Sequence, residues 1–263
     1  MIDIDSGTIE VQGGHLYWEA AGRGTAVILL HGFSFDCRSW DPQMPALAAR
    51  HRVVRYDLRG FGASTVPSGP YRHLDDLRAL TDALTLRRPV IVGLSLGANV
   101  ALAYSIAHAK DVAGLVLASP GLPGHRWLTP RPPEAVAAYA AQHGVMASKR
   151  FWLEQPIFDS LRDYPDAYRM VAAMVGDYSG WHWQNSDPQQ PGPDIRAGLR
   201  SLRVPTLIVS GNRDVAGYRE IAEEISVSVP QGNLVRFEKG GHVMNLEEPA
   251  EFTAHVLRFV DGL

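Results

Sequence analysis

The stretch Val90-Ile91-Val92-Gly93-Leu94-Ser95-Leu96-Gly97-Ala98 joins an apolar, β-branched run directly to an alanine-rich run. β-Branched residues favour a strand, and alanines favour a helix. Between the two runs lies the pattern G-x-S-x-G, in which Gly93 and Gly97 have no side chain and let the strand and the helix approach closely. A serine on such a sharp turn is held clear of the sheet. The sequence therefore predicts that Ser95 is a nucleophile.

Two later segments supply the acid and the base that a serine hydroxyl needs to become reactive. In this arrangement the acid and then the base follow the serine in the chain. Residues 204–210 have the pattern of a buried strand and are followed by Gly-Asn-Arg-Asp214, and residues 233–237 read as another strand, followed by Glu-Lys-Gly-Gly-His242. Asp214 is the expected acid and His242 the expected base. The paired glycines predict a mobile loop that swings the imidazole over Ser95.

Few other residues fit these two roles. Of the 10 histidines, His242 and His255 follow Asp214, and the amphipathic pattern of residues 249–260 makes His255 a solvated residue of a C-terminal helix. After the strand expected at residues 112–118, where an acid could also lie, the chain has Ser119-Pro120 and no carboxylate. Two further carboxylates stay open as alternative acids: Asp111 and Asp177.

The third requirement of such a site is a pair of backbone N–H groups that stabilise an oxyanion. One comes from the residue after the nucleophile, Leu96. Residues 26–30 read as a buried strand that runs into His-Gly-Phe33, where the glycine permits a turn that aims the Phe33 amide at the same point. His31 is expected to be structural, because His242 already fills the role of base.

The chain resembles the α/β-hydrolase fold family over essentially its whole length, and within that family the esterase and enol-lactonase group. The resemblance implies an α/β fold: a mostly parallel central sheet, helices on both faces and a helical cap insertion. Residues 57–64 are usually structural in this family, so the resemblance assigns no catalytic role to Asp57 or Arg59. The motifs that carry it occur in family order: H-G-F at residues 31–33, D-L-R-G-F-G-A-S at 57–64, G-L-S-L-G at 93–97, G-N-R-D at 211–214 and G-G-H-V-M-N-L-E-E-P at 240–249.

The order of patterns along the chain predicts the domain organisation. Residues 8–11 and 15–20 read as an N-terminal hairpin, after which strand and helix patterns alternate, as in a mostly parallel sheet. Alternation stops at Ser119 and resumes at Val204, and the stretch between reads as short helices. We therefore expect a core domain of residues 1–119 and 196–263 and a cap of residues 120–195. The core helices are expected at residues 40–49, 75–84, 98–107, 216–226 and 249–260.

Aromatic residues concentrate in the expected cap. A cap that closes over Ser95 would give the site an apolar roof, which excludes water and favours a substrate with a hydrophobic part. Trp152 and Trp181 are the expected substrate contacts. His182, which stands between two tryptophans, is expected to be a stacked histidine of the cap.

Composition excludes several other classes of protein. The chain of 263 residues has a net charge of −3 and therefore no basic stripe for nucleic acid. No apolar run approaches the roughly 20 residues of a membrane span, and the N-terminus lacks the pattern of a secretory signal. The single cysteine, Cys37, fits a reducing cytoplasm. No pattern indicates a metal or an organic cofactor. A cytoplasmic enzyme with a small-molecule substrate is expected, and its oligomeric state is left open.

The chemistry expected of Ser95, Asp214 and His242 is acyl transfer to water, so the sequence predicts a serine hydrolase of a carboxylic ester or lactone. Carbon–carbon bond hydrolases of this fold usually carry a polar residue before the nucleophile and an aromatic residue after the base, where this chain has Leu94 and Val243. Cofactor-free perhydrolases or haloperoxidases share the same triad and stay open. A ligand-binding protein without turnover is the alternative from another class, and the three intact candidate residues argue against it.

Overall fold

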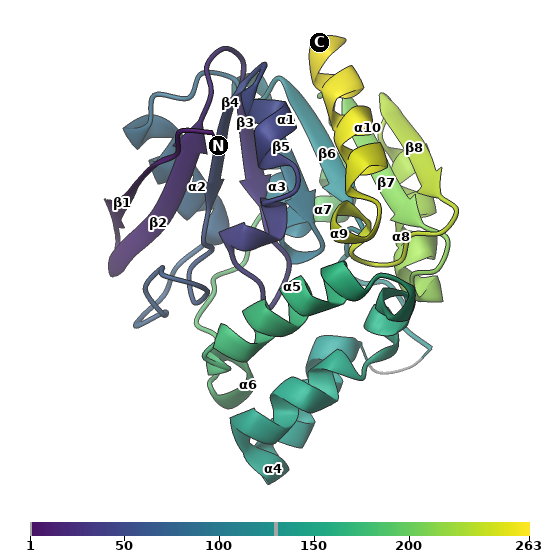
Figure 1. The fold of residues 1–263 in the computed structure, drawn as a ribbon. Coiled ribbons are helices and arrows are strands. Elements are labelled where there is room, and N and C mark those ends of the chain that lie inside the picture. Colours follow the sequence, from purple (N-terminus) through teal and green to yellow (C-terminus); the bar gives the residue numbers. More distant parts are fainter. Residues whose placement is uncertain (1, 129–130) are drawn as a thin grey trace.

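A computed structural model describes residues 2–128 and 131–263 (Figure 1). At its centre lies one eight-stranded sheet with the order β1-β2-β4-β3-β5-β6-β7-β8. The strand β2 pairs antiparallel with β1 and β4, and all other neighbours are parallel. The strands are β1 (Asp5–Val11), β2 (Gly14–Ala21), β3 (Ala26–Leu30), β4 (Arg52–Tyr56), β5 (Val90–Leu94), β6 (Gly114–Ala118), β7 (Thr206–Gly211) and β8 (Gly232–Phe237).

Burial explains why the inner strands form. Every residue of β3, β5, β6 and β7 is buried, because helices cover both faces of the sheet and these strands are mostly apolar. The edge strands β1 and β8 are partly exposed. Since neighbouring parallel strands end at the same edge of a sheet, the loops after β3, β5, β6, β7 and β8 meet there. This edge is where open α/β sheets bind their ligands.

The core helices lie on the two faces of the sheet (Figure 1). The helices α1 and α10 contact each other, as do α2 and α3, and α8 packs on β7 and β8. Their bounds are α1 (Met44–Ala48), α2 (His73–Ala83), α3 (Leu96–Ala107), α7 (Ile195–Leu199), α8 (Ala216–Ser228), α9 (Met244–Glu247) and α10 (Pro249–Asp261). Among the described residues, none of the helices is long and apolar enough to cross a membrane.

Four helical segments between β6 and β7 gather beyond the edge where the parallel strands end (Figure 1). They are α4 (Pro132–Leu153), the 3₁₀ segment η3 (Pro156–Asp163), α5 (Pro165–Asp177) and α6 (Trp181–Gln184). The expectation of short helices is met only in part, since α4 spans 22 residues, although Gly144 breaks it with φ 75° and ψ 169°. We call residues 120–195 the cap. Its limits stay a prediction, with α7 already packed on α3 where the cap ends.

One core helix differs from its expected form. Residues 40–49 do not form a single helix, because the 3₁₀ segment η1 (Cys37–Trp40) ends before α1 starts at Met44. Pro45 stands in the first turn of α1, where its missing N–H costs nothing and its ring sets the backbone for a helix start. A helix that began earlier would have placed this proline inside it. The strand β4 was not among the expected strands.

Candidate active site

The turn that carries Ser95 joins β5 directly to α3. Ser95 has φ 51° and ψ −108°, a strained conformation for a residue other than glycine. A Cβ at Gly93 would lie 2.3 Å from the carbonyl oxygen of Gly97, and one at Gly97 would lie 2.2 Å from that of Leu30. Both glycines are therefore required by close approach of the backbone. The Ser95 N–H donates to the carbonyl of Ala118 at 2.8 Å, which fixes the turn to β6.

Asp214 and His242 meet at the ends of β7 and β8. His242 Nδ1 lies 2.8 Å from Asp214 Oδ2, and both side chains are buried. The second oxygen of Asp214 accepts the N–H of Val215 at 2.7 Å. An ionised carboxylate can only accept, so Nδ1–H donates to Asp214 and the lone pair lies on Nε2. Nε2 is buried without a hydrogen-bond partner among the described residues. His242 and Ser95 line the same cavity.

The loop before His242 is held in place by hydrogen bonds and close backbone packing, more than is expected of a mobile loop. Gly241 donates its N–H to the buried carboxylate of Glu247, which also accepts from the Ser160 hydroxyl of the cap. A Cβ at Gly241 would lie 1.9 Å from the Ser160 oxygen, and one at Gly211 would lie 2.2 Å from the Gly241 carbonyl. The paired glycines thus allow close packing of the loop against the cap and β7, a different reason from the freedom of movement expected from the sequence.

Ser119 is a functional candidate that sequence reasoning missed. Its buried hydroxyl donates to Asp214 Oδ2 at 2.8 Å, the same oxygen that faces His242. Its φ of 43° is unusual for a serine and turns the side chain at the end of β6 toward this carboxylate. The available signal was its position directly after the strand expected at residues 112–118, where an acid could also lie.

Tyr218 is the second residue that sequence reasoning missed. Its ring centroid lies 4.3 Å from that of His242, and it lines the cavity with Ser95. Burial raises the pKa of Tyr218 to about 12, Asp214 adds to this rise, and a hydrogen bond with the Ser95 side chain opposes it. The phenol therefore stays protonated at neutral pH. Its position four residues after Asp214, in the first turn of α8, was the available signal.

The alternative acids and histidines lie elsewhere or have structural partners. Asp111 pairs with Arg78 at 2.8 Å, and Asp177 pairs with Arg38 at 2.8 Å, both on the exposed surface. His255 lies on α10 beside Glu251. The buried His31 accepts the N–H of Leu58 on Nε2 at 2.9 Å, and Nδ1 lies 2.8 Å from the Gly32 carbonyl. Burial lowers the pKa of His31, with Asp57 opposing, so it serves as a neutral structural residue.

The two expected oxyanion donors follow strands β3 and β5. Phe33 lies in the loop that lines the cavity with Ser95, and Leu96 is the first residue of α3. Neither N–H donates to a backbone or side-chain acceptor within residues 2–128 and 131–263. The first N–H groups of a helix have no partner within it, which leaves that of Leu96 free to bind an anion.

The cavity at Ser95 is small. Its volume of about 20 Å³ has room for roughly one water molecule. The buried Trp152 lines it and donates its indole N–H to the Ser34 hydroxyl at 2.7 Å. Trp181 is half-buried on α6, where it packs on His182, and it does not line this cavity. The described residues around the cavity are Gly32, Phe33, Phe35, Leu94, Ser95, Pro133, Trp152, Ile157, Phe158, Tyr218 and His242.

His182 is a stacked histidine of the cap. Its ring lies 4.5 Å from that of Phe61 at an angle of 15°, and its Nδ1 lies 2.8 Å from the Tyr178 hydroxyl. Burial lowers the pKa of His182 to about 4. It is therefore neutral at physiological pH and joins the cap to the core by packing.

Comparison with known proteins identifies the family. The model of the alpha/beta hydrolase family matches residues 27–255. The chain belongs to this family. It is similar to a putative carbamate hydrolase of Caulobacter sp. (strain K31), with 29% identity over 98% of this chain and 99% of that protein.

Solved structures of other α/β-hydrolases superimpose on almost the whole chain. A thermophilic esterase from Thermogutta terrifontis is 26% identical with a TM-score of 0.84, covering 98% of each chain. The enol-lactonase from Burkholderia xenovorans LB400 is 25% identical with a TM-score of 0.84, covering 97% of this chain and 100% of its own. Together with the family match, these relatives show that the chain is a hydrolase of this fold.

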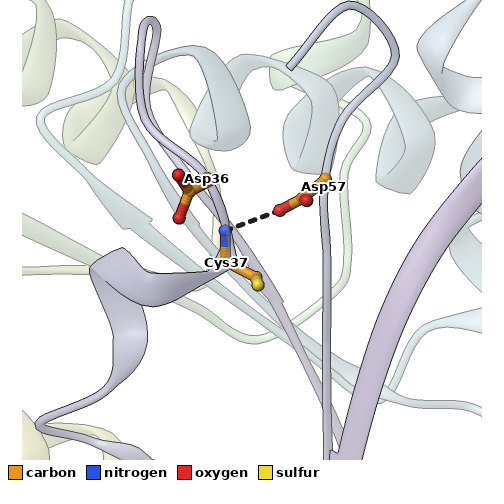
Figure 2. A group of neighbouring side chains, drawn as sticks. All are labelled: Asp36, Cys37 and Asp57. Atoms are coloured by element: carbon orange, nitrogen blue, oxygen red, sulfur yellow. Dashed lines mark hydrogen bonds between the residues drawn. The ribbon is translucent and has the colours of Figure 1, made fainter. Parts of the chain in front are cut away.

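A second polar cluster in this α/β-hydrolase has the residue types of a metal site. Figure 2 shows Asp36, Cys37 and Asp57 as neighbours. Their possible ligand atoms lie within 4.8 Å of one another. Asp57 accepts the N–H groups of Cys37 at 2.7 Å and Ala63 at 2.8 Å, one on each oxygen. Both carboxylate oxygens of Asp36 accept hydrogen bonds from the guanidinium of Arg38. Burial raises the pKa of the Cys37 thiol, whereas a metal requires the thiolate. These residues therefore serve the protein's own hydrogen bonds.

Proposed function

We propose that this α/β-hydrolase is a serine hydrolase that cleaves a carboxylic ester or lactone of a small, partly hydrophobic substrate. One observation carries the proposal. The strained Ser95 and Nε2 of His242, which has no hydrogen-bond partner in the described part of the chain, line one cavity. Asp214 lies 2.8 Å from the opposite ring nitrogen. Nucleophile, base and orienting acid thus occupy the order that acyl transfer needs.

In the first half-reaction, Ser95 Oγ attacks the substrate carbonyl carbon as Nε2 of His242 takes the hydroxyl proton. The carbonyl electron pair moves onto oxygen, where the N–H groups of Phe33 and Leu96 stabilise the charge. When this intermediate collapses, the carbon–oxygen bond to the alcohol breaks. The proton on Nε2 passes to the departing oxygen, which leaves an acyl group on Ser95.

In the second half-reaction, a water molecule replaces the alcohol. His242 takes one proton from the water while its oxygen attacks the acyl carbon, and the same proton returns to Ser95 Oγ as the carboxylic acid leaves. Asp214 holds the imidazole in the required tautomer and stabilises the imidazolium. Every proton and electron pair in this cycle is carried by Ser95, His242, substrate and water, so the reaction needs no cofactor.

The surroundings of Ser95 support a substrate with an apolar part. Phe33, Phe35, Trp152 and Phe158 line the cavity, and few of its wall atoms are polar apart from the reacting groups. The similarity to an esterase and to an enol-lactonase agrees with an oxygen ester as the scissile group. The expected cytoplasmic location is part of the same proposal, on the basis of the single buried cysteine.

Substitution of the nucleophile tests the proposal. Ser95→Ala should lower kcat for p-nitrophenyl acetate by about 10⁴- to 10⁶-fold, because only binding and oxyanion stabilisation remain. A fluorophosphonate probe should label the wild-type protein at Ser95 and leave the variant unlabelled. Ser105→Ala, a buried serine on the same helix, is the matched control and should keep activity and labelling. A folded Ser95→Ala protein that retains most of its turnover would exclude the serine mechanism.

A further inference from the structure

A second, larger cavity lies next to the one at Ser95. It has a volume of about 450 Å³ and is bounded by the start of α4, the start of η3, the first turn of α8 and residues 125–128. Its walls are mainly apolar, with Trp127, Pro132 and Pro156 among them. This volume falls within the roughly 300–1,000 Å³ of small-molecule sites. We call it the outer cavity and the one at Ser95 the inner cavity.

Consecutive residues separate the two cavities. On α4, Pro132 lines the outer cavity and Pro133 the inner one. At η3 the same holds for Pro156 and Ile157, and on α8 for Gly217 and Tyr218. The two cavities are thus lined by neighbouring residues at three places that are far apart in the sequence.

The outer cavity lies on the side of the site where His242 is. Tyr218 contacts the ring of His242, and Trp127 packs on Tyr218 with 5.0 Å between ring centroids at 71°. A Cβ at Gly217 would lie 2.5 Å from the indole of Trp127, so this ring rests directly on the backbone of α8. A continuous series of aromatic rings therefore leads from the outer cavity to the catalytic base.

The proton transfer from His242 fixes which half of an ester lies on this side. Nε2 donates its proton to the departing oxygen, so the alcohol half must extend toward His242 and Tyr218, and the acyl half away from them. The inner cavity, closed by Phe33, Trp152 and Phe158, has room for only about one water molecule. The two halves of the substrate thus meet spaces of very different size.

We infer that the outer cavity binds the alcohol half of the substrate, and that the enzyme selects short acyl groups carried by large apolar alcohols. This inference rests on the proposed serine hydrolase function. The indole of Trp127 offers a flat apolar surface on which an aromatic alcohol packs. Because the inner cavity has room for about one water molecule, an acetyl group enters it with less displacement of Phe33, Trp152 and Phe158 than a longer acyl group does.

Two ester series measured with the wild-type enzyme test the inference. One series is ethyl, butyl, benzyl and 2-naphthyl acetate, corrected for leaving-group reactivity by their rates of alkaline hydrolysis. The other is p-nitrophenyl acetate, butyrate, hexanoate and octanoate. We expect kcat/KM to rise about 10-fold or more along the first series and to fall by a similar factor along the second. The opposite pair of trends, or two flat profiles, would overturn the inference.

The variant Gly217→Ala sharpens the test, because its methyl group displaces the Trp127 ring. It should lower kcat/KM for 2-naphthyl acetate about 10-fold and leave ethyl acetate within about twofold. Gly176→Ala is the matched control, since a Cβ at this helical glycine of α5 meets nothing within 4 Å. Trp127→Leu gives a second variant with the backbone of α8 unchanged. Equal losses on both acetates in both variants contradict the inference.

These outcomes separate the inference from the function on which it rests. Ser95-dependent turnover of p-nitrophenyl acetate with a preference for long acyl chains would preserve the serine hydrolase and overturn the alcohol subsite. An enzyme that hydrolyses no ester through Ser95 would overturn both.

Discussion

The inner cavity lies between two regions that are held in different ways: the loops at the strand ends and the cap. Hydrogen bonds fix the loops, with Asp214 alone accepting from Ser119 and Val215 and facing His242. In the cap, apart from the bond of Trp152 to Ser34, ring packing dominates the roof of the cavity. Directional bonds suit groups whose geometry sets a reaction, and packing suits a surface that fits a substrate. Changes in the loops should therefore affect all substrates alike, and changes in the cap should depend on substrate size.

Asp214→Asn gives the largest effect expected from this comparison. The amide favours the wrong imidazole tautomer, so kcat should fall by up to about 10⁴-fold, by the same factor for acetyl and longer acyl esters. Steady-state kinetics with p-nitrophenyl acetate and p-nitrophenyl butyrate measure kcat for a short and a longer acyl group. Asp111→Asn and Asp177→Asn, which lose only exposed ion pairs, are the controls and should stay within about twofold. If Asp177→Asn were the damaging change, Asp214 would not be the acid.

The strand-end loops were predictable from the sequence for a physical reason. Buried parallel strands are apolar runs, and their carboxyl ends meet at one edge of the sheet. A polar residue directly after such a run is therefore close to the residues after the other runs. On this basis the sequence predicts that Ser95, Asp214 and His242 lie close together, and the structure brings them to one cavity.

The cap was less predictable, because nothing in its sequence fixes how its helices lie. Trp152 and Trp181 looked equivalent as aromatic residues of the cap, yet Trp152 lines the inner cavity and Trp181 does not. The difference depends on how the helices pack: Trp152 of α4 packs on Phe33, whereas Trp181 of α6 packs on His182. Ser119 and Tyr218 could not be predicted from the sequence for another reason: a hydroxyl that supports an acid or a base has no sequence motif of its own.

Substitutions of Trp152 and Trp181 test the comparison in the cap. Trp152→Phe and Trp152→Ala should change kcat/KM by about 5- to 150-fold between large and small acyl esters, since a lost aromatic contact is worth about 1–3 kcal/mol. Trp181→Ala should leave this ratio within about twofold. The alanine variant also opens a cavity in a buried site and should melt earlier, so thermal melts accompany the kinetics. A larger effect from Trp181 than from Trp152 would show that the cap closes differently around substrate.

Ser119→Ala tests the comparison in the strand-end loops, where it is expected to have the smallest effect. Its hydroxyl shares Asp214 Oδ2 with His242, and losing one such hydrogen bond costs about 1 kcal/mol, or roughly 5-fold in kcat/KM. Without this donor the carboxylate keeps more charge for the imidazolium, so the acid limb of the pH profile of kcat/KM should move to higher pH.

A purely structural role for Ser119 would lower the melting temperature and leave the pH profile in place, which distinguishes the two readings. Ser105→Ala removes another buried hydroxyl, one without a hydrogen-bond partner among the described residues, and should change neither profile nor rate. If folded Ser119→Ala matches that control on esters of every size, Asp214 is positioned by Val215 and the backbone alone. The directional network that distinguishes the loops from the cap would then end at Asp214 and His242.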